Sequence, residues 1–593
     1  MKIKLFFLIV FAISCNALNA QLPTKNIQDS ELNKRIQLVT DRLVFGNEPS
    51  ITEDFILACV TLDPQFKRRF TEFSGDQSGR YLSVFSKLNI DGNPINIHQL
   101  VKKIIATQKS DGRFGADTLN FNTTSLKDPQ MALLWGNGRL FTGLMDYYES
   151  YKDPEVLKSA VRLAEFLMSI TENMVKPEII SELKEKGATG FICFTQNVEG
   201  LVKLYNATKN KKYIQLAEKI YPLLTDKGIQ HSHGYLNTLR GVLMLYNATQ
   251  QKEQLDFVTS RYNLVVESTD MMVTGGVPEF FGGGASADGY RDEVCSEADW
   301  VMLSLELWQT TGENKYLDKA EFCLMNELML NQFESGDFGH HHIEKDFGYK
   351  LSFCEGRSWW CCDYHCLQAM MQFKNSIVTN NAGAKKINLF YTTEFNDKDM
   401  SFNFTKVSKS NTSFKIKINQ AESKEIAISI RKPYWAKYMS IKINGSTIEA
   451  KEQGGYLTLS KKWKADDEID VNLDYAVSFI TKHKEIISLE NAKSNLEGVA
   501  LQFGPYLMGV DDGFMPLFLA EPATKNVIII DKTLSNNCSS KSVENTLLPE
   551  AYCTFKYTHE SFYGENNVTM RPVSEISHQR LANLKFWFNF KIK

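Results

Sequence analysis

The sequence predicts a multidomain α + β protein in which an N-terminal helical barrel of the (α/α)6 type precedes antiparallel β-sandwich domains. Apolar residues recur at helical spacing from about residue 30 to 380, one helix–turn–helix pattern repeats there, and the period changes to two after residue 385. The predicted parts are a signal peptide over residues 1–20, the barrel over 21–385, a β-sandwich over 386–495 and a β-rich region over 496–593.

The N-terminal residues have the order of a secretory signal peptide. Lys2 and Lys4 precede an apolar run from Leu5 to Ile13, and small residues follow up to Ala20. This run is too short to span a bilayer, and no later segment is apolar and long enough to do so. We therefore expect an exported protein, secreted or periplasmic. Cys15 is the alternative processing site, at which a lipid would anchor the chain to the outer membrane.

The helical repeat predicts how the barrel is built. In each copy an aromatic residue ends one helix, a polar turn follows, and a second amphipathic helix begins. The copies are Tyr148–Leu157, Tyr205–Tyr213, Tyr246–Leu255 and Trp308–Tyr316. Repeated helical hairpins form solenoids or closed toroids, and six hairpins fit within about 350 residues. Such barrels bring the loops of their inner helices to one cleft.

The part of the chain after residue 385 has the pattern of β-strands. Alternating runs such as Phe402–Val407, Phe414–Ile418 and Ile426–Ile430 are separated by turn sequences such as Asn444-Gly445. A period of two with Asn-Gly turns is typical of antiparallel strands. This pattern predicts the sandwich.

Composition narrows the classes of partner. A formal net charge of −3 over 593 residues leaves no basic surface for nucleic acid. Aromatic residues make up 12 % of the chain, which suits stacking against sugars. We therefore expect an oligosaccharide or polysaccharide as the partner.

Cysteines are crowded near the end of the helical region. Glu293-Val294-Cys295 is followed by the adjacent pair Cys361-Cys362. Adjacent cysteines rarely bridge each other, and three thiolates with one carboxylate form a workable zinc shell. We call Glu293, Cys295, Cys361 and Cys362 the Cys–Glu cluster. The alternatives are a purely structural zinc site, a disulfide from Cys295 to a later cysteine, and a rival metal cluster at His340–His342.

With this cluster in place, the chain resembles glycoside hydrolase families 127 and 146, typified by β-L-arabinofuranosidases. Similar strings occur in the same order along the chain. They are Ile104–Gly112, the cluster itself, Leu303–Tyr316 with Glu321 and Asn326, Ile430–Ala436 and Gly498–Pro505. The resemblance covers about residues 40 to 510.

The resemblance implies a zinc-dependent retaining glycosidase that cleaves a terminal β-L-arabinofuranoside or a related sugar. The Cys–Glu cluster would hold the zinc ion, and Cys361 would be the nucleophile. Glu279, in a glycine-rich loop, would be the general acid, with Asp288 and Asp292 in reserve. Glu321 would contact sugar hydroxyls.

The sequence departs from the family at the sugar subsite. Gln196 and Asn237 stand where the family has histidines, and His231 or His233 could reach the same space. Trp135 and Arg139 are further candidates for the cleft, with a structural role as the alternative. The altered subsite leaves glycosidic cleavage better supported than arabinofuranose itself.

Two other functions fit the architecture. A helical-barrel polysaccharide lyase or uronyl hydrolase would need no zinc–thiolate centre. A non-catalytic glycan-binding protein would keep the zinc as a structural ion. Tightly bound zinc separates the first from the predicted glycosidase, and the loss of turnover in Cys361→Ser separates the second.

Overall fold

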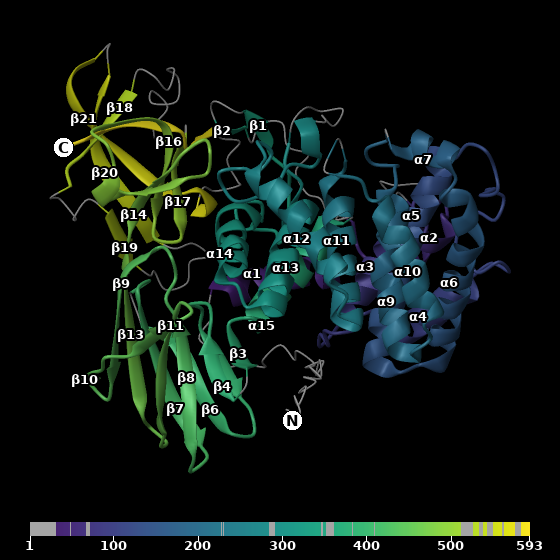
Figure 1. Cartoon of the computed structure of the whole chain (residues 1–593), viewed down its shortest axis with the longest axis horizontal. Coiled ribbons are helices and arrows are strands. Elements are labelled where there is room, and N and C mark those ends of the chain that lie inside the picture. The colour runs from purple at the N-terminus through teal and green to yellow at the C-terminus, as the bar shows by residue number, and fades with distance from the viewer. Residues whose placement is uncertain are drawn as a thin grey trace, which may run out of the picture.

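A computed structural model describes residues 31–593 except 48, 67–71, 185, 227, 229, 284–290, 345–347, 351–360, 382, 408–409, 512–525, 533–537, 542–549, 560–561 and 576–582. The predicted signal peptide, Cys15 and Asp288 lie outside the described residues. The helices occupy one half of the molecule and the sheets the other (Figure 1). Within the described part of the chain, no helix combines the length and apolarity that crossing a membrane requires.

Six helices of the N-terminal half form a ring. Each contacts the next in chain order, and the last returns to the first. They are α3 (Asp76–Phe85), α5 (Asp128–Tyr151), α9 (Asn197–Thr208), α11 (Ser232–Thr249), α13 (Val294–Thr311) and α15 (Cys362–Asn375). The remaining described helices are α1 (Glu31–Phe45), α2 (Glu53–Thr61), α4 (Ile97–Ala106), α6 (Pro154–Met174), α7 (Pro177–Lys184), α8 (Ile192–Thr195), α10 (Lys212–Ile220), α12 (Lys252–Glu267) and α14 (Asn314–Cys323).

The predicted repeat marks the ends of four ring helices. In each copy the carbonyl of the aromatic residue accepts a hydrogen bond from a left-handed residue four positions later, which stops the helix. The four pairs are Tyr148 and Lys152, Tyr205 and Lys209, Tyr246 and Gln250, and Trp308 and Gly312. Each of these four ring helices is followed by a further helix, as α5 is followed by α6, whose N-cap residue is Asp153.

Two antiparallel-rich sheets follow the helices. One sheet has the strand order β10-β9-β13-β7-β6-β5, and the other has the order β11-β12-β8-β4-β3. Their strands are β3 (Val378–Asn381), β4 (Ala384–Ile387), β5 (Thr393–Asn396), β6 (Met400–Lys406), β7 (Ser413–Ala421), β8 (Glu425–Arg431), β9 (Ala436–Ile443), β10 (Ser446–Thr447), β11 (Lys451–Gln453), β12 (Tyr456–Lys462) and β13 (Glu468–Tyr475). Alternate residues of β6 and β7 are buried, as the period of two predicts.

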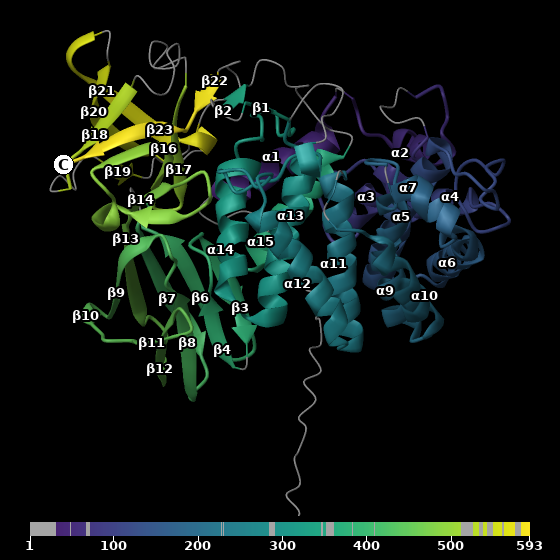
Figure 2. The same cartoon turned by 45° about the horizontal axis from the view of Figure 1, so that its top comes forward.

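A third sheet contains the C-terminal strands. They are β14 (Val477–Ile480), β15 (Ile486–Ser488), β16 (Asn495–Phe503), β17 (Tyr506–Asp511), β18 (Asn526–Ile530), β19 (Cys538–Lys541), β20 (Glu550–His559), β21 (Phe562–Pro572), β22 (Asn583–Lys585) and β23 (Phe588–Ile592). Two strands from the helical half, β1 (His342–Glu344) and β2 (Gly348–Lys350), extend this sheet beside β22 (Figure 2). The change of sheet falls between Tyr475 and Val477, before the predicted boundary at 495. A disulfide joins Cys538 to Cys553 on neighbouring strands.

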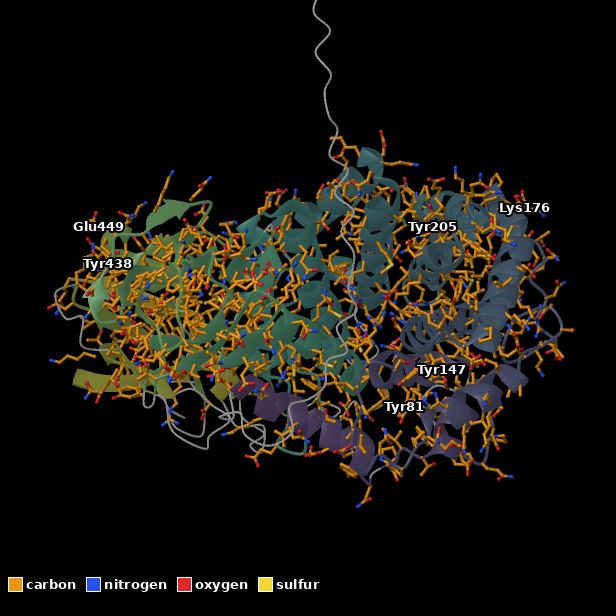
Figure 3. All side chains as sticks on the ribbon, turned by 90° about the horizontal axis from the view of Figure 1, so that it is seen from below. Tyr81, Tyr147, Lys176, Tyr205, Tyr438 and Glu449 are labelled. Carbon is orange, nitrogen blue, oxygen red and sulfur yellow. A yellow bond between two sulfur atoms is a disulfide. The ribbon has the colours of Figure 1, made fainter. Side chains whose placement is uncertain are left out.

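The hydrophobic core has two parts. One part runs without interruption from the helical half into the first two sheets. The other fills the third sheet and includes Met272, Met325 and Leu330 from the helical half. The far end of the first two sheets is solvent-exposed, and Tyr438 lies there, away from Tyr81 in the helical half (Figure 3).

Candidate active site

The Cys–Glu cluster forms where two neighbouring ring helices begin. Glu293 is the N-cap residue of α13, and Cys295 lies in the first turn of that helix. Cys361 is the N-cap residue of α15, and Cys362 is its first residue. Because α13 and α15 pack against each other, residues far apart in sequence come together at their N-termini. Helix N-termini favour negative charge, which suits thiolates and a carboxylate.

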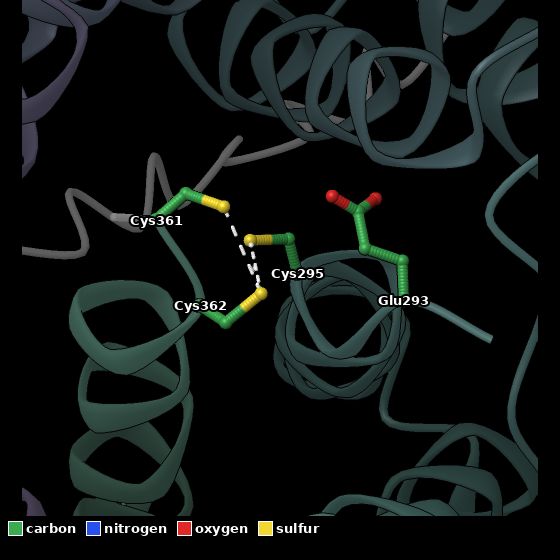
Figure 4. Close-up of side chains that lie close together, drawn as sticks. All are labelled: Glu293, Cys295, Cys361 and Cys362. Atoms are coloured by element: carbon green, nitrogen blue, oxygen red, sulfur yellow. Dashed lines mark hydrogen bonds between the residues drawn. The ribbon is translucent and has the colours of Figure 1, made fainter. Parts of the chain in front are cut away.

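The four side chains converge closely enough to share one ion. One ligand atom from each residue lies within 4.8 Å of the others. The Sγ of Cys362 is 3.4 Å from Sγ of Cys295 and 3.7 Å from Sγ of Cys361 (Figure 4). All four residues are buried. A buried set of three sulfurs and one carboxylate oxygen can hold a metal ion.

The three thiols differ in their ionisation. Hydrogen bonds from Cys295 and Cys362 lower the pKa of Cys361 well below its usual value, and the charge of Arg80 acts in the same direction. Burial raises the pKa of Cys295 and Cys362 well above theirs. The cluster therefore gathers negative charge on Cys361 first.

A histidine and a serine hold the carboxylate of the cluster. His231 Nε2 lies 3.1 Å from Oε2 of Glu293, and Ser296 Oγ donates to the same oxygen at 3.0 Å. Burial opposes the charged imidazole, but the carboxylate of Glu293 raises the pKa of His231 above its usual value. His231 and Glu293 therefore favour each other's charged forms.

Glu279 lies in the segment next to this histidine. Arg291 donates two hydrogen bonds to its carboxylate, at 2.6 and 3.0 Å. The backbone of Glu279 pairs with that of Ser232 on one side and that of Arg291 on the other. Glu279 also acts electrostatically on His231, so the predicted acid is brought to the neighbourhood of the cluster and is held in orientation.

Two arginines of the ring helices contact one histidine. Arg80 Nη2 and Arg139 Nη2 each lie 2.9 Å from Nε2 of His233. Nδ1 of His233 donates to Asp299 at 2.5 Å. Burial and the arginine charges lower the pKa of His233 well below its usual value, so the ring is neutral and its Nε2 is an acceptor. Asp299 also accepts hydrogen bonds from His365 and Arg240.

Gln196 and Asn237, the predicted substitutes for the family histidines, both bond to neighbouring ring helices. Gln196 precedes α9, and its Nε2 donates to the carbonyl of Trp135 at 3.2 Å. Its Oε1 is buried and has no hydrogen-bond partner among the described residues. Asn237, in α11, donates to Glu199 at 3.3 Å. Both are buried.

Two other predicted residues are engaged elsewhere. Glu321 accepts hydrogen bonds from Arg431 and Trp435 of the first sheets, each at 3.0 Å. These contacts place it at the junction of helices and strands, so it is not brought together with the cluster. Asp292 is buried and accepts from His341 and Asn331.

Two further groups of buried side chains have metal-like spacing. His233, Asp299 and His365 form the first group, but the arginines and Asp299 already occupy the nitrogens of His233. Asp292, Glu297 and Glu327 form the second. Neither group was expected from the sequence.

Sequence reasoning also passed over Arg80 and Arg291. A single arginine within a helix or loop carries no spacing signal. For Arg80, the one local indication is Asp76 four residues earlier, whose carboxylate accepts from its Nε at 3.1 Å.

Comparisons with known proteins agree with this arrangement. A family model described as "Beta-L-arabinofuranosidase, GH127 catalytic domain" matches residues 64–375, and one described as the GH127 middle domain matches residues 386–475. No curated protein matches the chain in sequence.

Solved structures of similar proteins span nearly the whole chain. A GH127 β-L-arabinofuranosidase from Geobacillus stearothermophilus T6 superposes with a TM-score of 0.69 at 14 % identity, covering 96 % of this chain and 100 % of that one. A second GH127 β-arabinofuranosidase gives a TM-score of 0.68 at 16 % identity, covering 96 % of each chain. At these identities the likeness concerns the fold.

Proposed function

The chain belongs to the GH127 β-L-arabinofuranosidase family and is a glycoside hydrolase, and from this premise we propose that it is a zinc-dependent retaining enzyme with Cys361 as its nucleophile. The observation that carries the proposal is the convergence of the Cys–Glu cluster within 4.8 Å at two adjacent helix N-termini. We also propose that the closed ring of helices is the inner wall of an (α/α)6 barrel and that the two sheets after it form a β-sandwich.

The donor set of the cluster fits zinc. Three thiols and one carboxylate make a soft shell of four ligands, which suits zinc better than magnesium or calcium. When bound, zinc would keep these thiols deprotonated at neutral pH. Glu293, Cys295 and Cys362 would hold the ion, and Cys361 would be its fourth ligand.

Exposure supports Cys361 as the reacting thiol. Cys361 keeps 6 % of its surface in contact with solvent, whereas Cys295 and Cys362 are fully enclosed. Its thiolate is also the one that its neighbours stabilise. A nucleophile has to reach the substrate, and among these three thiols this condition favours Cys361.

The proposed reaction has two steps. In the first, the Cys361 thiolate forms a C–S bond to the anomeric carbon while the glycosidic C–O bond breaks and Glu279 protonates the leaving oxygen. In the second, Glu279 takes a proton from water, the water oxygen bonds to the anomeric carbon, and the C–S bond breaks to restore the thiolate. Two displacements at one carbon retain its configuration.

The proposed substrate is a terminal β-L-arabinofuranoside or a related sugar of a glycan. Gln196, Asn237 and His233 would line its subsite, and the unpartnered Oε1 of Gln196 supports this for the first of them. We further propose that the protein is exported, because residues 1–20 have the pattern of a signal peptide. A lipid anchor at Cys15 is the alternative.

Metal content and the comparison of two cysteine variants test the proposed function. We expect about one zinc per chain by elemental analysis, and loss of both zinc and turnover after chelation. Cys361→Ser should reduce hydrolysis of aryl arabinofuranosides by at least ~10³-fold, because a hydroxyl is a far weaker nucleophile than a thiolate at neutral pH. Cys366→Ser is the matched control, since Cys366 is buried one helical turn away in α15 and is outside the cluster.

Two outcomes would contradict the proposal. A chain without zinc would refute the metal centre. Near-normal turnover in Cys361→Ser with zinc still bound would leave the cluster a structural site and assign catalysis elsewhere.

A further inference from the structure

Arg139 is a buried cation that forms no ion pair with any described residue. The residue is 5 % exposed, and its one hydrogen-bond partner among the described residues is Nε2 of His233. Its Nε is buried and has no partner, and no carboxylate of the described chain lies within ion-pair distance of it. Burying a charge without a counter-charge is unfavourable, so this arrangement points to a ligand that supplies the missing acceptor.

The number of N–H donors around His233 also indicates a ligand that accepts hydrogen bonds. Arg80 and Arg139 both direct Nη2 at one ring nitrogen, which has a single lone pair and accepts one strong hydrogen bond. Arg80 also has a buried Nη1 without a partner. The pair of guanidinium groups therefore presents more N–H donors than the described residues satisfy.

Asp299, Asp76 and Glu199 act electrostatically on Arg139, but each already accepts hydrogen bonds from other side chains. Glu199 accepts from Lys203 and from Asn237. Asp76 accepts from Arg80 and from Trp135. Asp299 accepts from His233, from His365 and from Arg240. Among the described residues, no carboxylate is therefore free to pair with Arg139, which leaves its charge available to a ligand.

Contacts connect Arg139 to the Cys–Glu cluster. Its guanidinium lies over the ring of Trp135, 5.2 Å from the centroid. The Trp135 ring is 5.8 Å from that of His231, and His231 contacts Glu293. Trp135 and Cys361, like Arg139, keep 5–6 % of their surface in contact with solvent. Arg80, which contacts the same His233 nitrogen as Arg139, also acts electrostatically on Cys361. These contacts link the surroundings of Arg139 to those of the cluster.

We propose that the sugar bound at the Cys–Glu cluster carries an anionic group, a carboxylate or a sulfate ester, which Arg139 and Arg80 bind. Arginine N–H groups match the oxygens of such anions. The inference rests on the proposed function, because it takes the cluster as the sugar site. It deepens that function by naming an acidic sugar as the substrate class.

Binding to the zinc-loaded full chain tests the proposal without requiring turnover. Galacturonate, galactose 6-sulfate and galactose share one ring and differ at C6, and glucuronate with glucose gives a second pair. We expect one anionic member of a set to bind at least about tenfold more tightly than its neutral partner, as charge-assisted hydrogen bonds imply. The anion that binds identifies the group. Equal affinities for anionic and neutral sugars in both sets would overturn the proposal.

Variants at Arg139 separate a binding role from a structural one. Arg139→Met should reduce the preference for anionic over neutral sugars to less than about threefold. It should leave the Tm of the ligand-free protein unchanged or raised, because an unpaired buried charge is removed. Arg139→Lys, which keeps the charge, should retain part of the preference. Arg162→Met is the control, since Arg162 is exposed and donates to the Lys109 carbonyl. A lowered Tm with an unchanged preference would contradict the proposal.

Turnover by the wild-type chain separates the two proposals. A wild-type chain that prefers anionic sugars but cleaves no glycoside would refute the catalytic function and leave the anion site in place. Cys361→Ser should keep the preference for anionic sugars while losing turnover. Hydrolysis of neutral arabinofuranosides without any anion preference would overturn the anion site alone.

Discussion

Cys361 and Cys362 are adjacent, yet the fold gives them different surroundings. Cys361 precedes the helix, with φ −143° and ψ −46°, while Cys362 is the first helical residue. The helical residue is fully enclosed, and the one before the helix retains contact with solvent. The start of the helix therefore gives two neighbouring residues different proposed roles. Cys361 is the proposed nucleophile, and Cys362 is proposed to bind the metal ion only.

The role of Glu279 is testable by the leaving group. Glu279→Gln should slow hydrolysis of substrates with poor leaving groups by about 10²–10⁴-fold and should affect activated aryl glycosides much less, because these need little proton donation. Steady-state rates on both substrates measure the difference. Arg291→Gln is the control, since it breaks the same ion pair and keeps the carboxyl group. An equal loss on both substrates, matched by Arg291→Gln, would show that only the ion pair matters.

At the scale of elements, buried charges connect the ring helices. Lys203 of α9 donates to Asp146 of α5 at 2.9 Å and to Glu199 of its own helix at 2.7 Å. Arg240 of α11 pairs with Asp299 and Glu306 of α13. The contacts to Asp146, Asp299 and Glu306 join neighbouring ring helices, so they set how the helices line up in addition to how tightly they pack.

Lys203 has a close control in Lys87. Lys203→Met should lower the free energy of unfolding by about 3–5 kcal/mol, because it leaves two buried carboxylates without their main partner. Lys87 also pairs with Asp146, at 2.8 Å, but its side chain is 47 % exposed, so Lys87→Met should cost less than about 1 kcal/mol. Thermal unfolding of the three proteins measures both effects.

The effect of Lys203→Met should also depend on pH. Burial alone would raise the pKa of Glu199, but Lys203 and Arg240 lower it to about 2. Its contribution to stability is therefore complete above the unfolded value near ~4.5 and is lost as the pH falls toward 2. The difference between the wild-type protein and Lys203→Met should shrink over that range. A difference that does not change with pH would show that lost packing, and not lost charge, causes the destabilisation.

At the scale of the whole molecule, a few polar contacts join the helices to the sheets. Arg431 donates to Glu321, to Asp318 and to the carbonyl of Asn388. Asn326 donates to the carbonyl of Pro505 at 2.9 Å and accepts from the backbone of Leu507 at 2.7 Å. Because all of these residues except Asp318 are buried, the contacts hold the helices firmly against the sheets.

A substitution at Glu321 tests whether this residue joins helices to sheets or contacts the substrate. Glu321→Gln should lower the free energy of unfolding by about 1–3 kcal/mol, because Arg431 and Trp435 lose a charged acceptor, and it should leave KM unchanged. Asp318→Asn is the control for a more exposed partner of the same arginine. Thermal unfolding and steady-state kinetics measure the two effects. A raised KM with an unchanged Tm would restore the role in sugar binding that the resemblance implies.

Local patterns were sufficient for the elements and for the identity of the cluster. The aromatic residue of each repeat predicted where four ring helices end, because the turn that stops a helix depends on residues only four positions apart. The period of two predicted strands such as β6 and β7 for the same kind of reason. The unusual Glu-x-Cys and Cys-Cys pairs predicted the cluster, because few other uses exist for so many thiols at that spacing.

Only the tertiary structure decided which distant residues meet. Arg80, Arg139 and His233 come from three different ring helices, and no spacing in the sequence links them. The resemblance of its sequence motif to the family suggested that Glu321 contacts a sugar, whereas in the structure it pairs with Arg431. The sequence records each residue's own preference for a helix or strand, but the closure of the ring determines which side chains share a buried space and which charges remain unpaired in it.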